Sequence, residues 1–151
     1  MVWIETHAER SLVIAADKSA IRALIVDVPT SGPFFPGVDR IDDLGDHTYG
    51  WWLTERRTLG TSFRGEYVTQ YDVAGEGDVT WRTLRGNLEV TGRWSLSGPD
   101  GSVRVTVAVT TKLDAPVPRI LKKPAILFAE KEARDGLAKQ LERVKDHLRR
   151  I

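Results

Sequence analysis

The stretch VTWRTLRGNLEVTGRWSLSGPDGSVRVTVAVTTKL, residues 79–113, places apolar side chains at every second position along successive runs. The alternate valines within residues 103–109 show this period most clearly. A period of two is that of a β-strand with one buried face, and the turn sequence Gly98-Pro-Asp-Gly101 separates two such runs. The stretch therefore predicts antiparallel strands, each with one dry and one wet face.

The period changes in PAILFAEKEARDGLAKQLERVKDHLRRI, residues 124–151. Apolar residues there recur every three or four positions, which predicts an amphipathic α-helix with Pro124 in its first turn. Its inward stripe is Ala133, Leu137, Leu141, Val144 and Leu148. At about 1.5 Å per residue the helix is roughly 40 Å long, enough to cross a small sheet. Gly136, in its middle, marks a bend or leaves room for a ligand or a neighbouring strand.

The N-terminal part predicts a strand followed by a short helix. Residues 4–15 form the expected strand, and Asp17 is the expected N-cap, its carboxylate accepting from the first free amides of the helix. One helical stripe consists of Ile21, Leu24, Ile25 and Val28. Pro29 is expected to stop this helix.

The segment 29–37 is predicted to be an irregular loop, because it is rich in proline and glycine. It nevertheless carries Phe34 and Phe35 side by side. These rings either plug the core beneath the loop or form an apolar rim at the mouth of a pocket.

Six further strands complete the predicted architecture. They cover residues 38–44, 48–58, 62–73, 79–85, 88–97 and 102–113. Charged residues opposite the apolar positions predict a solvated outer face: Arg64, Glu66, Arg82, Glu89, Arg93, Arg104 and Lys112. The fold class is therefore α+β, with a curved antiparallel sheet of six to seven strands wrapped around a long C-terminal helix and a short helix after the first strand.

The bulk composition indicates one globular domain. A chain of 151 residues with 41% hydrophobic and 28% charged residues can bury a core of its own. No apolar run approaches the ~20 residues that span a bilayer, and no secretory signal is visible at the N-terminus. The chain has no cysteine, which leaves no disulfide and no thiolate site. We therefore expect a cytoplasmic protein.

Several segments resemble the START-like helix-grip (SRPBCC) superfamily. They are Phe34-Phe-Pro-Gly-Val38, Val79-Thr-Trp-Arg82, Val90-Thr-Gly-Arg-Trp94, Gly98-Pro-Asp-Gly101 with the strand after it, and Pro116-Val-Pro-Arg119. The pattern is most similar to the bacterial polyketide cyclase/dehydrase and lipid-transport branch, which includes coenzyme Q-binding proteins. The resemblance covers residues 1–151 as a single START-like domain. It implies a cavity between the sheet and the last helix for lipids, quinones, polyketides or other apolar molecules.

The same cavity is plausible from the residues themselves. Large aromatic residues across a bent sheet cannot all meet a helix that carries small side chains at Ala129, Ala133 and Gly136, so some space is expected to remain. We predict an apolar ligand site formed by Phe34, Phe35, Tyr49, Trp51, Tyr67, Trp81, Trp94, Ala133 and Leu137. No cofactor is expected.

Catalytic motifs are absent from the sequence. The three histidines are scattered without metal-ligand spacing, and no nucleophile elbow, phosphate loop or dinucleotide-binding glycine pattern occurs. The acid–base candidates are Tyr49, Tyr67, Tyr71, Glu66 and His7, none with a partner at a recognisable spacing. We therefore assign no catalytic and no metal-binding residue.

Three functions remain open. The first is binding or transport of a hydrophobic small molecule, and the second is a polyketide cyclase/dehydrase-like enzyme that uses the same cavity. The third is a peripheral membrane or protein-docking module in which Arg119, Lys122 and Lys123 act together with the Phe34-Phe35 loop. Residues 119–151 carry ten basic and five acidic residues, whereas the remainder is slightly acidic. Nucleic-acid binding is not expected, and the protein is predicted to be a monomer or a homodimer.

Overall fold

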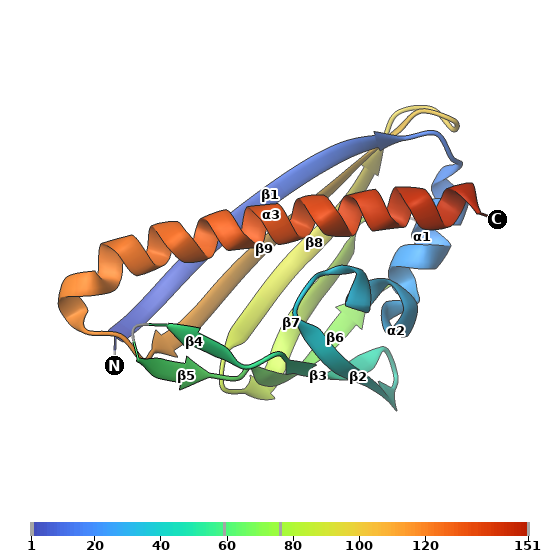
Figure 1. Cartoon of the computed structure of the whole chain (residues 1–151). Coiled ribbons are helices and arrows are strands. Elements are labelled where there is room, and N and C mark those ends of the chain that lie inside the picture. Colours follow the sequence, from blue (N-terminus) through green and yellow to red (C-terminus); the bar gives the residue numbers. More distant parts are fainter. Residues whose placement is uncertain (1, 59, 76, 151) are drawn as a thin grey trace.

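The computed structural model describes residues 2–58, 60–75 and 77–150 and has the predicted α+β architecture. Long helix α3 (Lys122–Arg149) lies across one face of a seven-stranded antiparallel sheet, which curves around it (Figure 1). The sheet strands are β1 (Val2–Ile14), β2 (Val38–Gly45), β3 (Thr48–Leu53), β6 (Glu66–Asp72), β7 (Val79–Gly86), β8 (Glu89–Ser97) and β9 (Val103–Ala115). Their order across the sheet is β1-β9-β8-β7-β6-β3-β2.

Smaller elements complete the chain. These are helices α1 (Lys18–Val26) and α2 (Val28–Ser31), the 3₁₀ turns η1 (Gly32–Phe34) and η2 (Arg119–Leu121), and the separate hairpin of β4 (Arg56–Thr58) and β5 (Thr61–Phe63). Helices α1 and α2 cover the end of the sheet near the C-terminus of α3, and the hairpin lies near the start of α3 (Figure 1). Among the described residues, no helix is both long and apolar enough to cross a bilayer.

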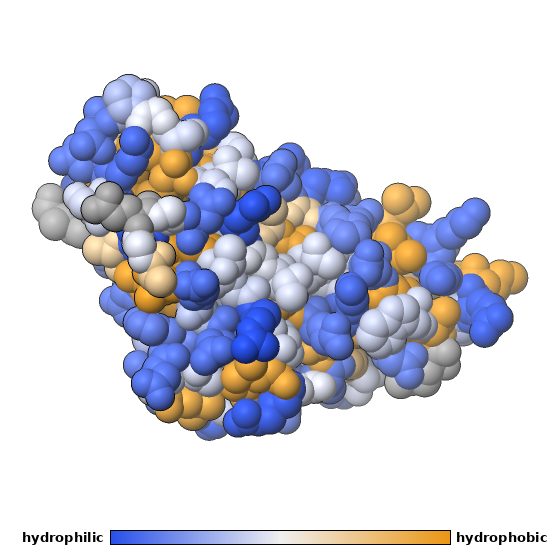
Figure 2. Space-filling model, turned by 180° about the vertical axis from the view of Figure 1, so that it is seen from behind, coloured by the Kyte–Doolittle hydropathy of each residue, from blue (hydrophilic) through white to orange (hydrophobic). Residues whose placement is uncertain are grey.

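The alternation along the strands is confirmed by burial. Val103, Val105 and Val107 are fully buried on the α3 side, and β9 pairs with β1 in an unbroken register from Val2↔Ala115 to Ile14↔Val103. The opposite face of the sheet is largely hydrophilic (Figure 2). On α3 the predicted stripe faces the core, with Leu137, Leu141 and Val144 buried.

The predicted strand over residues 48–58 is wrong in its second half. β3 ends at Leu53, and Arg56–Thr58 pairs with Thr61–Phe63 in the separate hairpin. The predicted strand 62–73 is broken as well, at Gly65. A Cβ there would lie 2.8 Å from the side chains of both Leu53 and Leu88, so glycine permits a close approach that ends the regular pairing.

The loop predicted for residues 29–37 is mostly helical. Helix α1 already ends at Val26, and Pro29 lies in the first turn of α2, where its missing N–H costs no helical hydrogen bond. The chain then continues through η1 into Phe35. Pro29 therefore helps to begin a second helix instead of ending the first.

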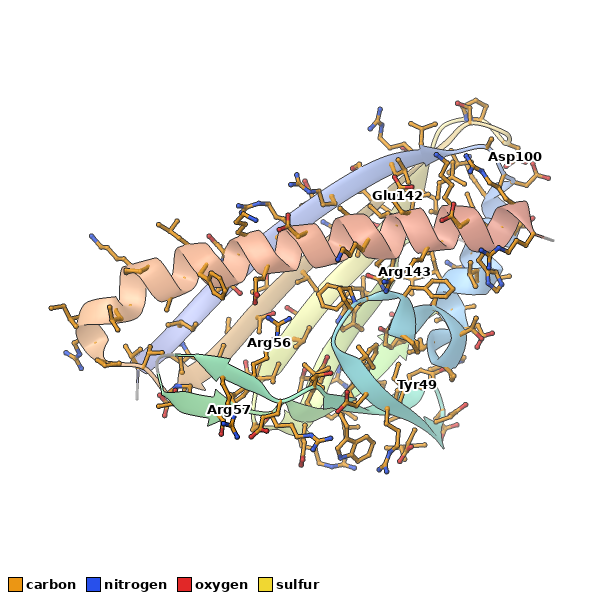
Figure 3. The ribbon with its side chains drawn as sticks, in the orientation of Figure 1. Tyr49, Arg56, Arg57, Asp100, Glu142 and Arg143 are labelled. Atoms are coloured by element: carbon orange, nitrogen blue, oxygen red, sulfur yellow. The ribbon has the colours of Figure 1, made fainter. Side chains whose placement is uncertain are left out.

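The N-cap of α1 is supplied from another part of the chain. Asp17 occupies the N-cap position, but its side chain makes no capping hydrogen bond. The backbone N–H of Lys18 instead donates to Asp100 Oδ1 at 2.9 Å, and Asp100 lies in the turn between β8 and β9 (Figure 3). The predicted capping role of Asp17 is thus wrong, because a tertiary contact replaces the local one.

Candidate functional site

A cavity of about 170 Å³ lies between the sheet and α3. Most of its wall is aromatic or aliphatic and comes from strands β3, β6, β7, β8 and β9, with α3 opposite. The lining residues are Phe35, Val38, Trp51, Leu53, Tyr67, Thr69, Tyr71, Trp81, Leu88, Val90, Trp94, Val109, Thr111, Ala133, Leu137 and Gln140. The sheet thus supplies all the aromatic rings of the lining except Phe35, and α3 supplies Ala133, Leu137 and Gln140.

Two stacked aromatic pairs form the strand side of this wall. Trp51 and Tyr67 are direct cross-strand partners, with ring centroids 5.9 Å apart and an interplanar angle of 3°. Tyr71 and Trp81 are also cross-strand partners and stack at 5.4 Å and 18°. Trp81 lies opposite Gly92 on β8, and a Cβ at that position would overlap the indole. Gly92 therefore leaves the space that the Trp81 ring occupies.

Some polar groups of the cavity have hydrogen-bond partners within the protein, and others do not. The indole N–H of Trp51 donates to Thr69 Oγ1 at 2.8 Å, and the Gln140 side-chain amide donates to the carbonyl of Ser31 at 3.5 Å. No hydrogen bond among the described residues engages the hydroxyl of Tyr67 or Tyr71, although both rings are buried. Because no fully buried side-chain oxygen of the described residues lacks a partner, both hydroxyls must keep accessible surface. Both residues belong to the lining of the cavity.

Burial also sets the protonation of these phenols. It raises the pKa of Tyr67 far above the usual 10.0, and burial together with the neighbouring Tyr67 and Tyr49 raises the pKa of Tyr71 well above it. At neutral pH both groups are neutral phenols, which can donate a hydrogen bond to an oxygen on a ligand. Burial, helped by Asp43 and Asp27, raises the pKa of Tyr49 as well.

The α2–η1 segment closes one side of the cavity through contacts with α3. The ring of Phe35 covers Gly136, and a Cβ at residue 136 would lie 2.6 Å from the ring. Arg143 Nη1 donates to the carbonyl of Phe34 at 2.7 Å, which fixes the segment to the helix (Figure 3). Phe34 is not part of the cavity lining, and its ring centroid lies 5.7 Å from that of His147.

The β4–β5 hairpin meets α3 on another side. Arg56 of β4, labelled in Figure 3, forms an ion pair with Glu132 of α3, the residue before the cavity-lining Ala133. Both side chains are partly exposed. The pair links the hairpin to the helix, and both of its side chains remain accessible to solvent.

Seven of the nine predicted site residues line the cavity: Phe35, Trp51, Tyr67, Trp81, Trp94, Ala133 and Leu137. Phe34 and Tyr49 do not. Phe34 packs beside His147, and Tyr49 is buried against Tyr71 with rings 5.6 Å apart and nearly perpendicular. The first alternative for the loop, rings plugging the core, describes Phe34 better, and Phe35 is part of the cavity wall.

Other lining residues were missed by the sequence reasoning. Thr69 alternates with Tyr67 and Tyr71 on one strand, so the period of two carried a signal for it. Gln140 lies beside the helical stripe, and nothing in the sequence distinguishes it from a solvated glutamine. Only the packing of α2 against α3 reveals that it is buried.

Some of the acid–base candidates line the cavity and others lie outside it. His7 lies on the outer face of β1, with Nδ1 2.9 Å from Thr110 Oγ1 and Nε2 3.0 Å from Glu5 Oε2, and Glu66 is exposed. Among the described residues that line the cavity, the titratable side chains are Tyr67 and Tyr71. In the part of the chain that the structure describes, no three His, Asp or Glu side chains gather as a metal site would require.

Comparison with known proteins gives matches in structure alone. No protein-family model and no curated protein matches the chain. A START superfamily protein from Mycobacterium smegmatis superposes with a TM-score of 0.67 at 21% identity, over 94% of this chain and 98% of its own. The Zhui aromatase/cyclase from Streptomyces sp. R1128 superposes with a TM-score of 0.67 at 16% identity, over 97% of this chain and 95% of its own. This chain therefore has the START-like helix-grip fold.

Proposed function

We propose that this protein binds a compact apolar molecule that carries an oxygen acceptor, in the cavity between the sheet and α3. One observation carries the proposal: two neutral phenolic hydroxyls, on Tyr67 and Tyr71, have no hydrogen-bond partner among the described residues and belong to the wall of an aromatic cavity. A carbonyl or hydroxyl oxygen on the ligand would accept from them. Stacked aromatic rings would hold its apolar body.

The size of the cavity narrows the ligand class. Sites for drug-sized molecules usually measure about 300–1,000 Å³, whereas an apolar cavity of about 150 Å³ holds a molecule the size of benzene. At about 170 Å³ this cavity suits one aromatic ring, a small fused pair with some opening, or a short acyl chain. A long fatty acid would have to leave most of its chain outside.

The lining favours binding over proton abstraction. A general base needs a pKa near the working pH, and the raised pKa of Tyr67 and Tyr71 keeps both protonated. Among the described lining residues there is no carboxylate and no imidazole to take their place. The structural similarity to a START superfamily protein and to an aromatase/cyclase supports the apolar class of ligand, since the cavity lies within the shared fold.

A tryptophan fluorescence titration tests the proposal, because Trp51, Trp81 and Trp94 wall the cavity. We expect saturable quenching with one site for a naphthol or a naphthoquinone, and weaker binding of palmitate. Ala133→Phe fills the cavity and should weaken binding at least about tenfold, in line with displacing a ligand of this size. Ala74→Phe adds the same ring at an exposed position and should leave affinity unchanged. Absence of saturation, or equal affinity in both variants, would refute the site.

A further inference from the structure

The end of the molecule where η2 enters α3 exposes an unusual amount of apolar surface. Among the described residues, the most exposed large hydrophobic side chains are Ile120 at 87%, Leu127 at 68%, and Phe128 and Trp3 at 54% each. They belong to η2, the first turns of α3 and the start of β1. These segments lie at the same end of the molecule in Figure 1. Beneath them, a small buried cluster holds the end together: Val2, Ile4, Ala115 and Val117, with Ala125 and Ile126 packed against it.

Unpaired positive charge accompanies this apolar surface. Arg119, Lys122 and Lys123 are exposed, and none of their side chains forms a hydrogen bond or ion pair with another described residue. Residues 115–129 contain these three basic residues and no acidic one. The acidic residues at either side of that range are Asp114 and Glu130, and Glu130 already accepts from the backbone N–H of His7 at 2.8 Å.

Exposed Leu, Phe and Ile beside unpaired Lys and Arg form the combination that binds anionic lipid surfaces. The apolar side chains enter the boundary between headgroups and acyl chains, and the cations stay among the phosphates. We propose that this end, the α3 tip (Arg119–Lys123 with Leu127 and Phe128), docks on an anionic bilayer surface. Trp3 flanks the tip, and tryptophan favours the same interfacial depth.

The α3 tip differs from the membrane-binding surface expected from the sequence. That surface combined the same cations with Phe34 and Phe35. Those rings lie beside His147 and Gly136. Gly136 is fourteen residues beyond Lys122 on α3, or about 21 Å along the helix axis at ~1.5 Å per residue. The proposed docking surface is therefore confined to the α3 tip, and Phe35 is part of the cavity wall instead.

Vesicle co-sedimentation tests this proposal with the whole protein. We expect binding to phosphatidylcholine vesicles that contain roughly 30% phosphatidylglycerol, little binding to pure phosphatidylcholine, and loss of binding as salt rises from about 0.05 M to about 0.5 M. Lys122→Gln/Lys123→Gln removes two cations and should weaken binding roughly 10- to 30-fold. Leu127→Ser/Phe128→Ser should weaken it by a similar factor while leaving the charge unchanged.

Matched controls lie elsewhere on the surface. Lys18→Gln/Lys139→Gln removes two exposed cations away from the tip, and Leu44→Ser/Leu84→Ser removes two exposed apolar side chains. Both should bind like wild type. Equal binding to the two vesicle types, no binding to the anionic vesicles, or an equal loss in the controls would overturn the proposal. An acidic protein as the true partner of the tip would give the second of these results.

The cavity and the tip can be tested separately. Ligand titration of the tip variants should give the wild-type affinity, because none of the substituted residues lines the cavity. Failure of either proposal therefore leaves the other standing.

Discussion

The aromatic ring of Phe35 lies directly over Gly136, and a Cβ at residue 136 would come within 2.6 Å of the ring. The three atoms closest to that Cβ all belong to Phe35. The contact joins the segment after η1 to the middle of α3 at the wall of the cavity. The sequence left open a bend, or room for a ligand or a neighbouring strand, at this position. The structure shows a different reason for the glycine: Gly136 makes room for the Phe35 ring.

This contact predicts a strongly non-additive pair of substitutions. In the wild-type background, Gly136→Ala gains up to about 1 kcal/mol of helix propensity but must displace the Phe35 ring, so the free energy of unfolding should rise little or fall. In a Phe35→Ala background the space is free, and the same change should stabilise by about 1 kcal/mol. Urea denaturation of the four proteins measures the coupling, and simple additivity would contradict the packing.

The unpaired tyrosine hydroxyls predict a change in binding with little change in stability. Tyr67→Phe and Tyr71→Phe remove oxygens that have no partner among the described residues, so the free energy of unfolding should change by less than about 1 kcal/mol. Affinity for a naphthol should fall by roughly fivefold for each lost hydrogen bond, whereas affinity for naphthalene should stay the same. Equal loss for both ligands would mean that the hydroxyls do not contact the ligand oxygen.

The same tyrosines predict a loss of stability at high pH. Their pKa is raised in the folded state, so they stay protonated above pH 10, where the phenols of the unfolded chain ionise. Their contribution is complete below about pH 10 and is lost as the pH rises, by up to about 1.4 kcal/mol per pH unit for each group. Urea midpoints between about pH 9 and about pH 11 should fall less steeply for Tyr67→Phe/Tyr71→Phe. An unchanged slope would contradict the burial of these phenols.

The Arg56–Glu132 ion pair predicts a kinetic effect. Both partners are partly exposed, so Glu132→Gln should cost less than about 1 kcal/mol of stability. Release of a bound naphthol should nevertheless become faster, because the pair holds the hairpin against α3 beside Ala133. Stopped-flow fluorescence measures the rates, with Asp135→Asn as control, since it breaks the Lys131–Asp135 pair on the same helix. Equal release rates in both variants would exclude a role for Arg56 and Glu132 in closing the cavity.

The tertiary cap of α1 predicts that two nearby aspartates differ in their contribution. Asp100→Ala removes the acceptor of the Lys18 N–H and should lower the free energy of unfolding by about 0.5–2 kcal/mol. Asp17→Ala removes a side chain that makes no capping hydrogen bond and should cost less. Thermal denaturation of the two variants compares them directly. A larger loss of stability for Asp17→Ala than for Asp100→Ala would mean that Asp17 caps the helix and would contradict the tertiary cap.

Much of the fold was predictable because it depends on periodicity. The valines of 103–109 and the α3 stripe around Leu137 mark buried faces that any register of the fold must respect. The positions at which strands are interrupted were harder to predict. At Gly65 the regular pairing ends where the side chains of Leu53, in β3, and Leu88, between β7 and β8, come close to the backbone.

The candidate site was predictable in its aromatic wall and much less so in its polar and closing parts. Trp51, Tyr67 and Trp81 follow from strand alternation. The burial of Gln140 and the contact of Phe35 with Gly136 depend on how α2 and η1 pack against α3, over about a hundred residues of sequence separation. A local sequence pattern does not reveal contacts between residues so far apart in the chain. The cap that Asp100 gives to α1 could not be predicted for the same reason.

The central claim is that a compact oxygen-bearing apolar ligand occupies the cavity. Intermolecular NOEs between a bound naphthol and ¹³C-labelled methyl groups of the protein test it most directly. The account predicts NOEs to Leu88, Val90, Val109 and Leu137. It predicts none to Ile21, Leu24 or Ile25, which are buried in α1 outside the cavity lining. Saturable binding with NOEs to other methyl groups, or no binding of any such compound, would contradict the account.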